Sequence, residues 1–225
     1  MKKQKIVIVL IVLSQLFVGC KTMNNTQKGT AIGVAGGAAL GALVGKWAGN
    51  TAAGAIIGAA VGGTAGVLIG KYMDKQVAEL QADLQDAKVE RVGEGIKITF
   101  NSGILFDINS NKLGDVAKDN IGKLAVVLKK YEDTDVLIEG HTDSTGPAEF
   151  NQTLSENRAA SVSHFLSLNA VNSARLTTVG YGPNQPLVDN DTPANRSLNR
   201  RVEIAIYAND KLKKAAERGQ IGDLE

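Results

Sequence analysis

The sequence has few of the residues on which redox, metal and catalytic sites are usually built. Its 225 residues include one cysteine and two histidines. A single cysteine has no partner for an intramolecular disulfide. Two histidines, without a free thiol beside them, are too few to suggest zinc coordination, so we expect no bound metal. No glycine-rich loop has the spacing that cradles a phosphate, and we expect no cofactor.

The chain also lacks a strong excess of charge of one sign. It has 25 Lys and Arg against 23 Asp and Glu. Three of these lysines, Lys2, Lys3 and Lys5, belong to an N-terminal leader. Without them the count is 22 basic against 23 acidic residues, a net charge of about −1. Such a chain offers no general electrostatic attraction for nucleic acid.

Residues 1–19 have the layout of a secretory signal peptide. The lysines precede an apolar run from Ile6 to Leu13, and the small residue Gly19 comes directly before Cys20. The apolar run is shorter than the ~20 residues that a spanning helix requires. A free buried thiol is the alternative reading of Cys20, but so close to the N-terminus it has no core in which to lie.

The segment Phe17 to Cys20 (FVGC) resembles a bacterial lipobox, although that pattern prefers leucine where Phe17 stands. The resemblance implies that Cys20 is acylated with fatty chains such as palmitate. It also implies that residues 20–28 are a lipid-anchored N-terminal segment. More than one acyl chain gives stable membrane attachment. The residue after the cysteine is Lys21 rather than aspartate. This resembles the enterobacterial sorting pattern of lipoproteins that are sent to the outer membrane.

Glycines then repeat at four-residue steps and so share one helix face. They are Gly29, Gly33, Gly37, Gly41, Gly45 and Gly49, followed after one slip by Gly54, Gly58, Gly62, Gly66 and Gly70. Stripes of small residues let helices approach closely in lipid or in an assembly. The pattern predicts a helical hairpin over 29–71, with helices at 30–48 and 52–71, and resembles the glycine-zipper domains of envelope proteins. A flexible Gly/Ala linker is the alternative, and insertion in a bilayer and self-association both remain open.

Residues 72–92 predict a connecting helix. Met73, Val77, Leu80, Leu84 and Ala87 recur at steps of four and three. Such a short heptad seam suits either a coiled coil between two chains or a helix whose apolar edge lies on the next domain.

Residues 93–208 are long enough for one globular core. Strands are expected at 94–100, 135–140, 175–181 and 200–207, and helices over 112–130 and from Pro147 to about 168. The order β-α-β-α-β-β predicts an α/β (α+β) fold with a mixed sheet and helices packed on one face. Residues 189–197 are expected to be loop, and 209–225 a charged, frayed tail.

Five segments of this domain resemble the OmpA-like peptidoglycan-binding family. They are ILFDINS, GHTDSTG, NQTLSENRAASV, TTVGYGPNQP and NRRVEI, in the family's order and approximate spacing across 94–207. With the lipobox and the glycines that repeat from Gly29 to Gly70 (the glycine ladder), the whole chain resembles YiaD-type outer-membrane lipoproteins. The resemblance implies a β/α sandwich that binds the stem peptide of peptidoglycan without covalent attachment. It also implies a place on the outer membrane, facing the periplasm.

An acid and a guanidinium that converge on one pocket suit a ligand with both an ammonium and a carboxylate group, such as diaminopimelate. By resemblance, Asp143 and Arg158 are the principal pair, and Asn109, Asn151 and Arg200 support them. From the bare sequence, Asp143 could instead cap a turn, and Arg158 could pair with Asp143 or Glu156 at the surface. Alternation along a strand sends Arg200 and Arg201 to opposite faces, and the sequence does not fix which one faces the ligand.

We do not expect an enzyme, because His141, Asp143 and Ser144 are neighbours in sequence and this does not make a triad. A second candidate function starts from the glycine zipper. The chain would then be a membrane oligomer or an envelope stress-signalling protein, with wall binding secondary.

Overall fold

The structure is a computed structural model that describes residues 51–221. Strands with alternating apolar residues form a five-stranded sheet. The strands are β1 (Lys88–Val92), β2 (Gly95–Asn101), β3 (Thr134–His141), β4 (Leu176–Gly180) and β5 (Arg201–Ala208). They lie in the order β1-β2-β5-β3-β4, with β3 and β4 parallel and the other neighbours antiparallel. The mixed sheet and the four strands expected from the sequence are confirmed, as β2, β3, β4 and β5.

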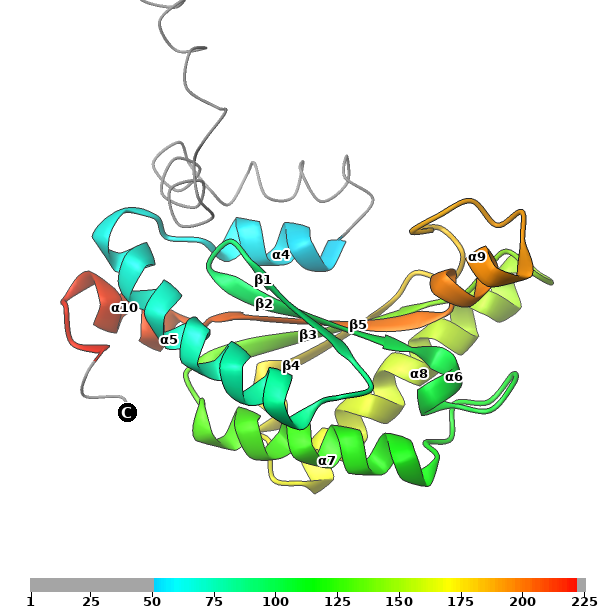
Figure 1. Ribbon diagram of the computed structural model, residues 1–225, viewed down its shortest axis with the longest axis horizontal. Helices are drawn as coiled ribbons and strands as arrows, with labels where there is room; N and C mark the ends of the chain where they lie inside the picture. Colours follow the sequence, from blue (N-terminus) through cyan, green and yellow to red (C-terminus); the bar gives the residue numbers. More distant parts are fainter. Residues whose placement is uncertain (1–50, 222–225) are drawn as a thin grey trace, which may run out of the picture.

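Helices cover the two faces of this sheet unequally (Figure 1). The helices of one layer are α5 (Gly63–Asp83), α7 (Asp115–Lys130), α8 (Ala148–Leu168) and α10 (Asp210–Glu217). Short helices α6 (Ser102–Leu105) and α9 (Pro193–Asn199) and the 3-10 turn η2 (Ser173–Arg175) lie in connections. On the opposite face lies α4 (Thr51–Ala59).

The main core lies between the sheet and the layer of α5, α7, α8 and α10. Every second residue of β2 points into it, as a strand with one such face requires. These residues are Ile96, Ile98 and Phe100, which pair with Ile206, Ile204 and Val202 of β5. Both helices that the sequence predicted between the strands, α7 and α8, supply the other side of this core.

The predicted connecting helix over 72–92 is only partly correct. Helix α5 runs through the expected boundary at residue 72 and ends at Asp83, and residues 88–92 form β1. This segment becomes a strand because it pairs with β2 across a tight turn, in which Gly93 has a φ of 52°. The apolar seam of α5 is buried in the main core, which confirms packing on the next domain rather than a coiled coil.

The charged tail predicted from residue 209 is corrected in part. Its first residues form α10, which the Asn209 side chain caps by accepting from the backbone N–H of Leu212 at 3.0 Å. Leu212 and Ala216 are buried against the core, and α10 packs beside α5. The loop expected at 189–197 likewise contains the start of α9.

The second half of the glycine ladder packs on this domain. The predicted helix 52–71 is divided, because Gly62 and Gly63 have φ angles of 72° and 61°, which favour glycine. The backbone N–H groups of Val61 and Gly62 donate to the Glu94 carboxylate at 2.8 and 2.9 Å. Gly66 lies against the same carboxylate, which leaves no room for a Cβ. At this end, therefore, the small residues permit close contact with the turn between β1 and β2.

Helix α4 covers part of the second face of the sheet. Its Ala52 and Ile56 pack with Ala205 of β5, in a small apolar cluster separate from the main core. The hydroxyl of Thr51 donates to the Glu139 carboxylate of β3 at 2.8 Å. Within residues 51–221 no helix has both the length and the hydropathy to cross a membrane. The leader, Cys20 and the zipper helix expected at 30–48 lie outside the described residues.

Candidate functional site

A cleft of about 460 Å³ lies where β2 and β3 end and α8 begins. Its walls come from α6 and the loop after it, the loop after β3, the first turns of α8, and α9 with the residue that follows it. The residues lining it are Ser102, Gly103, Phe106, Asp107, Ile108, Asn109, Thr142, Asp143, Thr145, Asn151, Leu154, Arg158, Arg196 and Arg200. All five residues named from the sequence as the ligand site are therefore brought to one cleft.

Two glycines place α8 close enough to the sheet to form this wall. A Cβ at Gly140 of β3 would overlap the Ser155 backbone of α8, and one at Gly180 of β4 would overlap Glu156. The Ser155 hydroxyl also accepts from the backbone N–H of Gly182 at 2.9 Å. Because α8 lies against bare backbone here, side chains on its cleft side reach the ends of the strands.

Arg158 is a buried cation without a carboxylate partner. Its side chain is 4% exposed, and it forms no ion pair with any described residue. Nε donates to the Ser110 carbonyl at 2.9 Å, Nη2 lies 3.4 Å from the Asp107 carbonyl, and the guanidinium lies 5.1 Å from the Phe106 ring centre. Burial, together with the nearby charge of Arg200, lowers the pKa of Arg158. Nη1 has no hydrogen-bond partner in residues 51–221, which leaves donors for a ligand.

Asp143 is the acid of the cleft, and its two oxygens are held by different partners. Oδ2 accepts from Arg200 Nη1 at 2.5 Å, and Oδ1 accepts from the backbone N–H of Thr145 at 2.8 Å. Burial alone would raise the pKa of Asp143, but the hydrogen bonds from Arg200 and Thr145 outweigh it and hold the pKa below its usual value. Asp143 therefore carries a negative charge, and a carboxylate oxygen can accept more than one hydrogen bond.

The two asparagines differ in their surroundings. Asn151 is buried, and its Nδ2 donates to the Thr145 carbonyl at 2.9 Å, so its amide braces the loop that carries Asp143. Asn109 is exposed and has a φ of 55°, a left-handed conformation that asparagine tolerates. This conformation turns the loop after Phe106 and lets its carbonyls reach Arg158.

Arg200, and not Arg201, lies in the cleft. Arg200 directly precedes β5, and its side chain is 42% exposed. Arg201 is buried on the second face of the sheet, where its Nε donates to Glu203 at 2.6 Å. The alternation along a strand separates the two arginines as expected.

Of the alternatives left open by the sequence, one applies in part. Asp143 does stabilise a local turn through Thr145, but it also faces the cleft. Arg158 pairs with neither Asp143 nor Glu156. His141, Asp143 and Ser144 do not form a triad, since neither ring nitrogen of His141 has a hydrogen-bond partner among the described residues.

Among the cleft residues that sequence reasoning did not name, two interact closely with the others or add charge. Phe106 lies under the Arg158 guanidinium, and Arg196 donates to the Asn190 carbonyl at 2.9 Å from the far wall. Phe106 stands in the motif FDINS, and a search for aromatic partners of Arg158 would have found it. With Arg196 included, the lining holds three arginines and two aspartates, so the cleft favours a ligand that presents a carboxylate.

Comparison with known proteins agrees with this architecture. Residues 105–200 match the OmpA family, and residues 1–74 match the YMGG-like Gly-zipper. The outer-membrane lipoprotein YfiB of Pseudomonas aeruginosa is 37% identical over 131 residues, which cover 58% of this chain and 78% of YfiB. The probable lipoprotein YiaD of Escherichia coli is 37% identical over 135 residues, or 55% of this chain and 62% of YiaD. The match spans only 35% of another relative, the outer membrane porin F of Pseudomonas fluorescens.

A solved structure shows the same fold. The cell wall anchor of the type VI secretion system from Pseudomonas aeruginosa superimposes with a TM-score of 0.54 and 27% identity, covering 61% of this chain and 97% of the anchor. These relatives are named as lipoproteins, a porin and an anchor rather than as enzymes, which supports the expectation that this chain is not an enzyme. The sequence motifs, the mixed sheet and these matches agree that the chain belongs to the OmpA family, with a glycine zipper at its N-terminus.

Proposed function

We propose that the cleft binds the stem peptide of peptidoglycan without a covalent bond, and that the chain tethers the outer membrane to the cell wall. The observation that carries this proposal is Arg158, a buried guanidinium that forms no ion pair with a carboxylate in the described part of the chain. Burying an unpaired cation is unfavourable, and a ligand carboxylate that completes the pair relieves that penalty. The name of the structural relative, a cell wall anchor, supports the same function.

Diaminopimelate suits the charges of the cleft. Its side-chain carboxylate would accept end-on from Nη1 and Nη2 of Arg158, in the planar geometry that a guanidinium favours. Its ammonium would donate to Asp143, which already accepts from Arg200. The ammonium joins this pair without displacing it, because each carboxylate oxygen has a second lone pair.

The membrane end of the tether is proposed from the lipobox and the relatives. YfiB and YiaD are named as lipoproteins, and YfiB as an outer-membrane one. Acylated Cys20 would hold the chain in the outer membrane with residues 51–221 in the periplasm. Anchoring at one end places the cleft among many stem peptides, which raises their effective concentration and compensates for a modest affinity at each site.

Pull-down with purified sacculi tests wall binding. The full-length chain should sediment with sacculi, and Asp143→Asn should stay in the supernatant. Asparagine keeps the acceptor for the Thr145 N–H but loses the charge that an ammonium needs. Asp119→Asn is the matched control, because Asp119 is an exposed acid of α7 that pairs with Lys123 on the same helix. Equal sedimentation of all three proteins would exclude the cleft as the wall-binding site.

The preferred stem peptide is tested with two soluble ligands that differ in one group. A peptide with diaminopimelate and the same peptide with lysine differ in the side-chain carboxylate alone. Calorimetric titration should give at least tenfold tighter binding of the diaminopimelate peptide, and Arg158→Lys should reduce this preference, because an ammonium lacks the planar fork. Equal affinities in the wild-type chain would leave wall binding standing but refute the assignment of that carboxylate to Arg158.

A further inference from the structure

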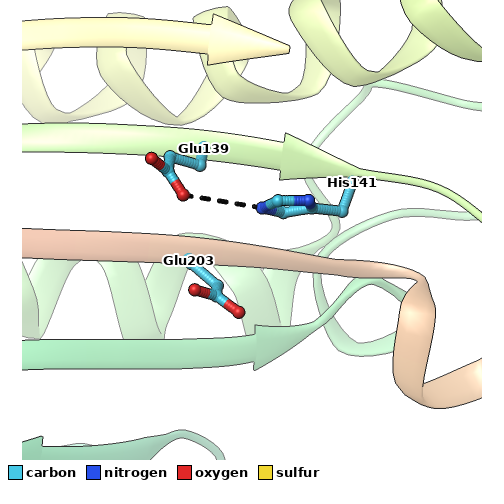
Figure 2. A group of neighbouring side chains, drawn as sticks. All are labelled: Glu139, His141 and Glu203. Atoms are coloured by element: carbon cyan, nitrogen blue, oxygen red, sulfur yellow. Dashed lines mark ion pairs between the residues drawn. The ribbon is translucent and has the colours of Figure 1, made fainter. Parts of the chain in front are cut away.

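Three polar side chains lie together on the second face of the sheet, away from the cleft. They are Glu139 and His141 of β3 and Glu203 of β5 (Figure 2). Glu139 stands directly opposite Glu203 in the register of the two strands, and His141 stands opposite Arg201. The exposed fractions of the three residues are 0%, 1% and 0%. Two carboxylates that face each other across a strand pair repel, and here water does not screen them.

Within residues 51–221, each of the three residues has a ligand atom without a hydrogen-bond partner. Glu139 Oε2 accepts from the Thr51 hydroxyl at 2.8 Å, but Oε1 has no hydrogen bond. Glu203 Oε1 accepts from Arg201 Nε at 2.6 Å, but Oε2 has none. Neither ring nitrogen of His141 has one. Buried polar atoms without partners are rare in native proteins and cost about 1–3 kcal/mol each.

The neighbouring cations are engaged elsewhere. Arg201 holds the other oxygen of Glu203 and also donates to the carbonyls of Asn199 and Gln185. Lys97, on the same face, lies 3.7 Å from Glu90. Neither cation therefore satisfies the free atoms of Glu139 and His141.

We propose that Glu139, His141 and Glu203 bind one divalent transition-metal ion of the zinc type. One nitrogen and two carboxylate oxygens are ligands that zinc accepts, and three protein ligands leave a fourth position for water. Magnesium and calcium prefer six or more oxygen ligands, which the described side chains at this site do not supply.

The distances require the three ligand atoms to move closer together. These atoms lie within 4.8 Å of one another, and His141 Nε2 lies 3.7 Å from Glu139 Oε2, the oxygen that also accepts from Thr51. Ligand atoms about 2.1 Å from a tetrahedral ion lie about 3.4 Å apart. The histidine and Glu139 would have to approach by well under 1 Å, and the most distant pair of ligand atoms by up to about 1.4 Å, which side-chain rotations supply.

The contacts around the three ligands are those that orient metal ligands in proteins. The Thr51 hydroxyl and Arg201 each hold one carboxylate oxygen and leave the other free. The His141 ring stacks on Tyr181 at 5.4 Å between ring centres, which fixes its plane.

The sequence predicts no metal here, because it counts two histidines and no free thiol. Only the register of β3 and β5 brings together acids that are 64 positions apart in the chain. An ion at this place would join β3 to β5 and, through Thr51 and Glu139, would hold α4 on the sheet.

Calorimetric titration of the full-length chain with zinc chloride, after removal of metals with a chelator, tests the site. All proteins carry Cys20→Ser, so that no thiol competes for zinc. The wild-type residues should bind one zinc ion, and His141→Ala should bind at least tenfold more weakly. His164→Ala is the matched control, since His164 is the other histidine and is exposed on α8. Loss of binding in His164→Ala, or unchanged binding in His141→Ala, would overturn the proposal.

A second variant guards against a misfolded His141→Ala. Glu203→Gln keeps the size of the side chain and an oxygen for Arg201, but it removes the negative charge. Cobalt chloride, added in place of zinc, should give visible absorption bands of a four- or five-coordinate site in the wild type. In Glu203→Gln these bands should shift or disappear while the circular dichroism spectrum stays unchanged. Identical cobalt spectra in the two proteins would refute the role of Glu203.

Discussion

Replacing Arg158 by alanine separates a ligand role from a structural role, because the two roles predict opposite changes in affinity and stability. In the proposed complex the guanidinium makes two charge-assisted hydrogen bonds to a carboxylate. Hydrogen bonds to charged groups contribute about 1.5–3 kcal/mol. A loss of about 3 kcal/mol corresponds to roughly a hundredfold weaker binding of the diaminopimelate peptide.

The same change should alter the free energy of unfolding very little. Alanine gives up the hydrogen bond to the Ser110 carbonyl, worth about 1.5–3 kcal/mol because its donor is charged, and the contact with Phe106, worth about 0.5–1 kcal/mol. Against this, it removes a buried charge that has no carboxylate partner. The space left behind opens into the cleft and fills with water. We expect a net change within about 1 kcal/mol, or about 2–4 °C in melting temperature.

Calorimetric titration and thermal denaturation of the same preparations measure both quantities. Arg218→Ala is the control, because Arg218 is an exposed arginine at the end of α10. A variant of Arg158 that melts more than 10 °C lower and binds the peptide within threefold of the wild type would show that the residue is structural, and the reasoning would then be wrong.

Three further changes test other parts of the structure. Arg175→Ala should lower the free energy of unfolding by about 2–4 kcal/mol, because this arginine donates to three backbone carbonyls far from the cleft. At temperatures where the variant is folded, its affinity for the peptide should be unchanged, and weakened binding would contradict this. Peptide affinity should stay constant from about pH 8 to about pH 5, because the lowered pKa of Asp143 keeps the carboxylate charged over this range. The charge is lost only as the pH falls through that lowered pKa. An affinity that changes with a midpoint above pH 5 would argue against a role of Asp143 in binding. Gly140→Ala should destabilise the fold by about 1–3 kcal/mol or more, because the added Cβ meets the Ser155 backbone. The Cβ of Gly122→Ala meets nothing within 4 Å, so this change within α7 should stabilise the fold by up to about 1 kcal/mol. Chemical denaturation would measure both free energies of unfolding.

The sequence predicted the sheet well because one physical signal dominates it. The strand containing Ile96, Ile98 and Phe100 buries alternate residues, and a period of two is visible in any window of that length. Strand β1 was missed because its alternation is weak and its partial burial depends on pairing with β2. Pairing is a tertiary interaction that local propensity does not report.

The residues of the proposed ligand site were predicted as a set, but the geometry of the cleft was not. Motif positions named Asp143 and Arg158, but the pairing of Asp143 with Arg200 and the isolation of Arg158 depend on where three separate loops meet. The glycine ladder from Gly29 to Gly70 was interpreted as a single helical hairpin. Two of its later glycines, Gly62 and Gly66, instead lie against Glu94, a carboxylate far along the chain that accepts from the Gly62 N–H.

The paired glycines between α4 and α5 have a mechanical consequence for a tether. Tension between lipid and wall would enter the described part of the chain at Thr51 and leave at the cleft. Helix α4 buries three residues and α5 buries eight, so α4 would detach first, with Gly62 and Gly63 as the pivot. Unwinding residues 51–62 would let this segment span up to about 40 Å when fully extended, before the proposed grip on the wall is strained. The force at which this first extension appears in single-molecule stretching, well below that of the sheet, would measure how much slack the envelope gains.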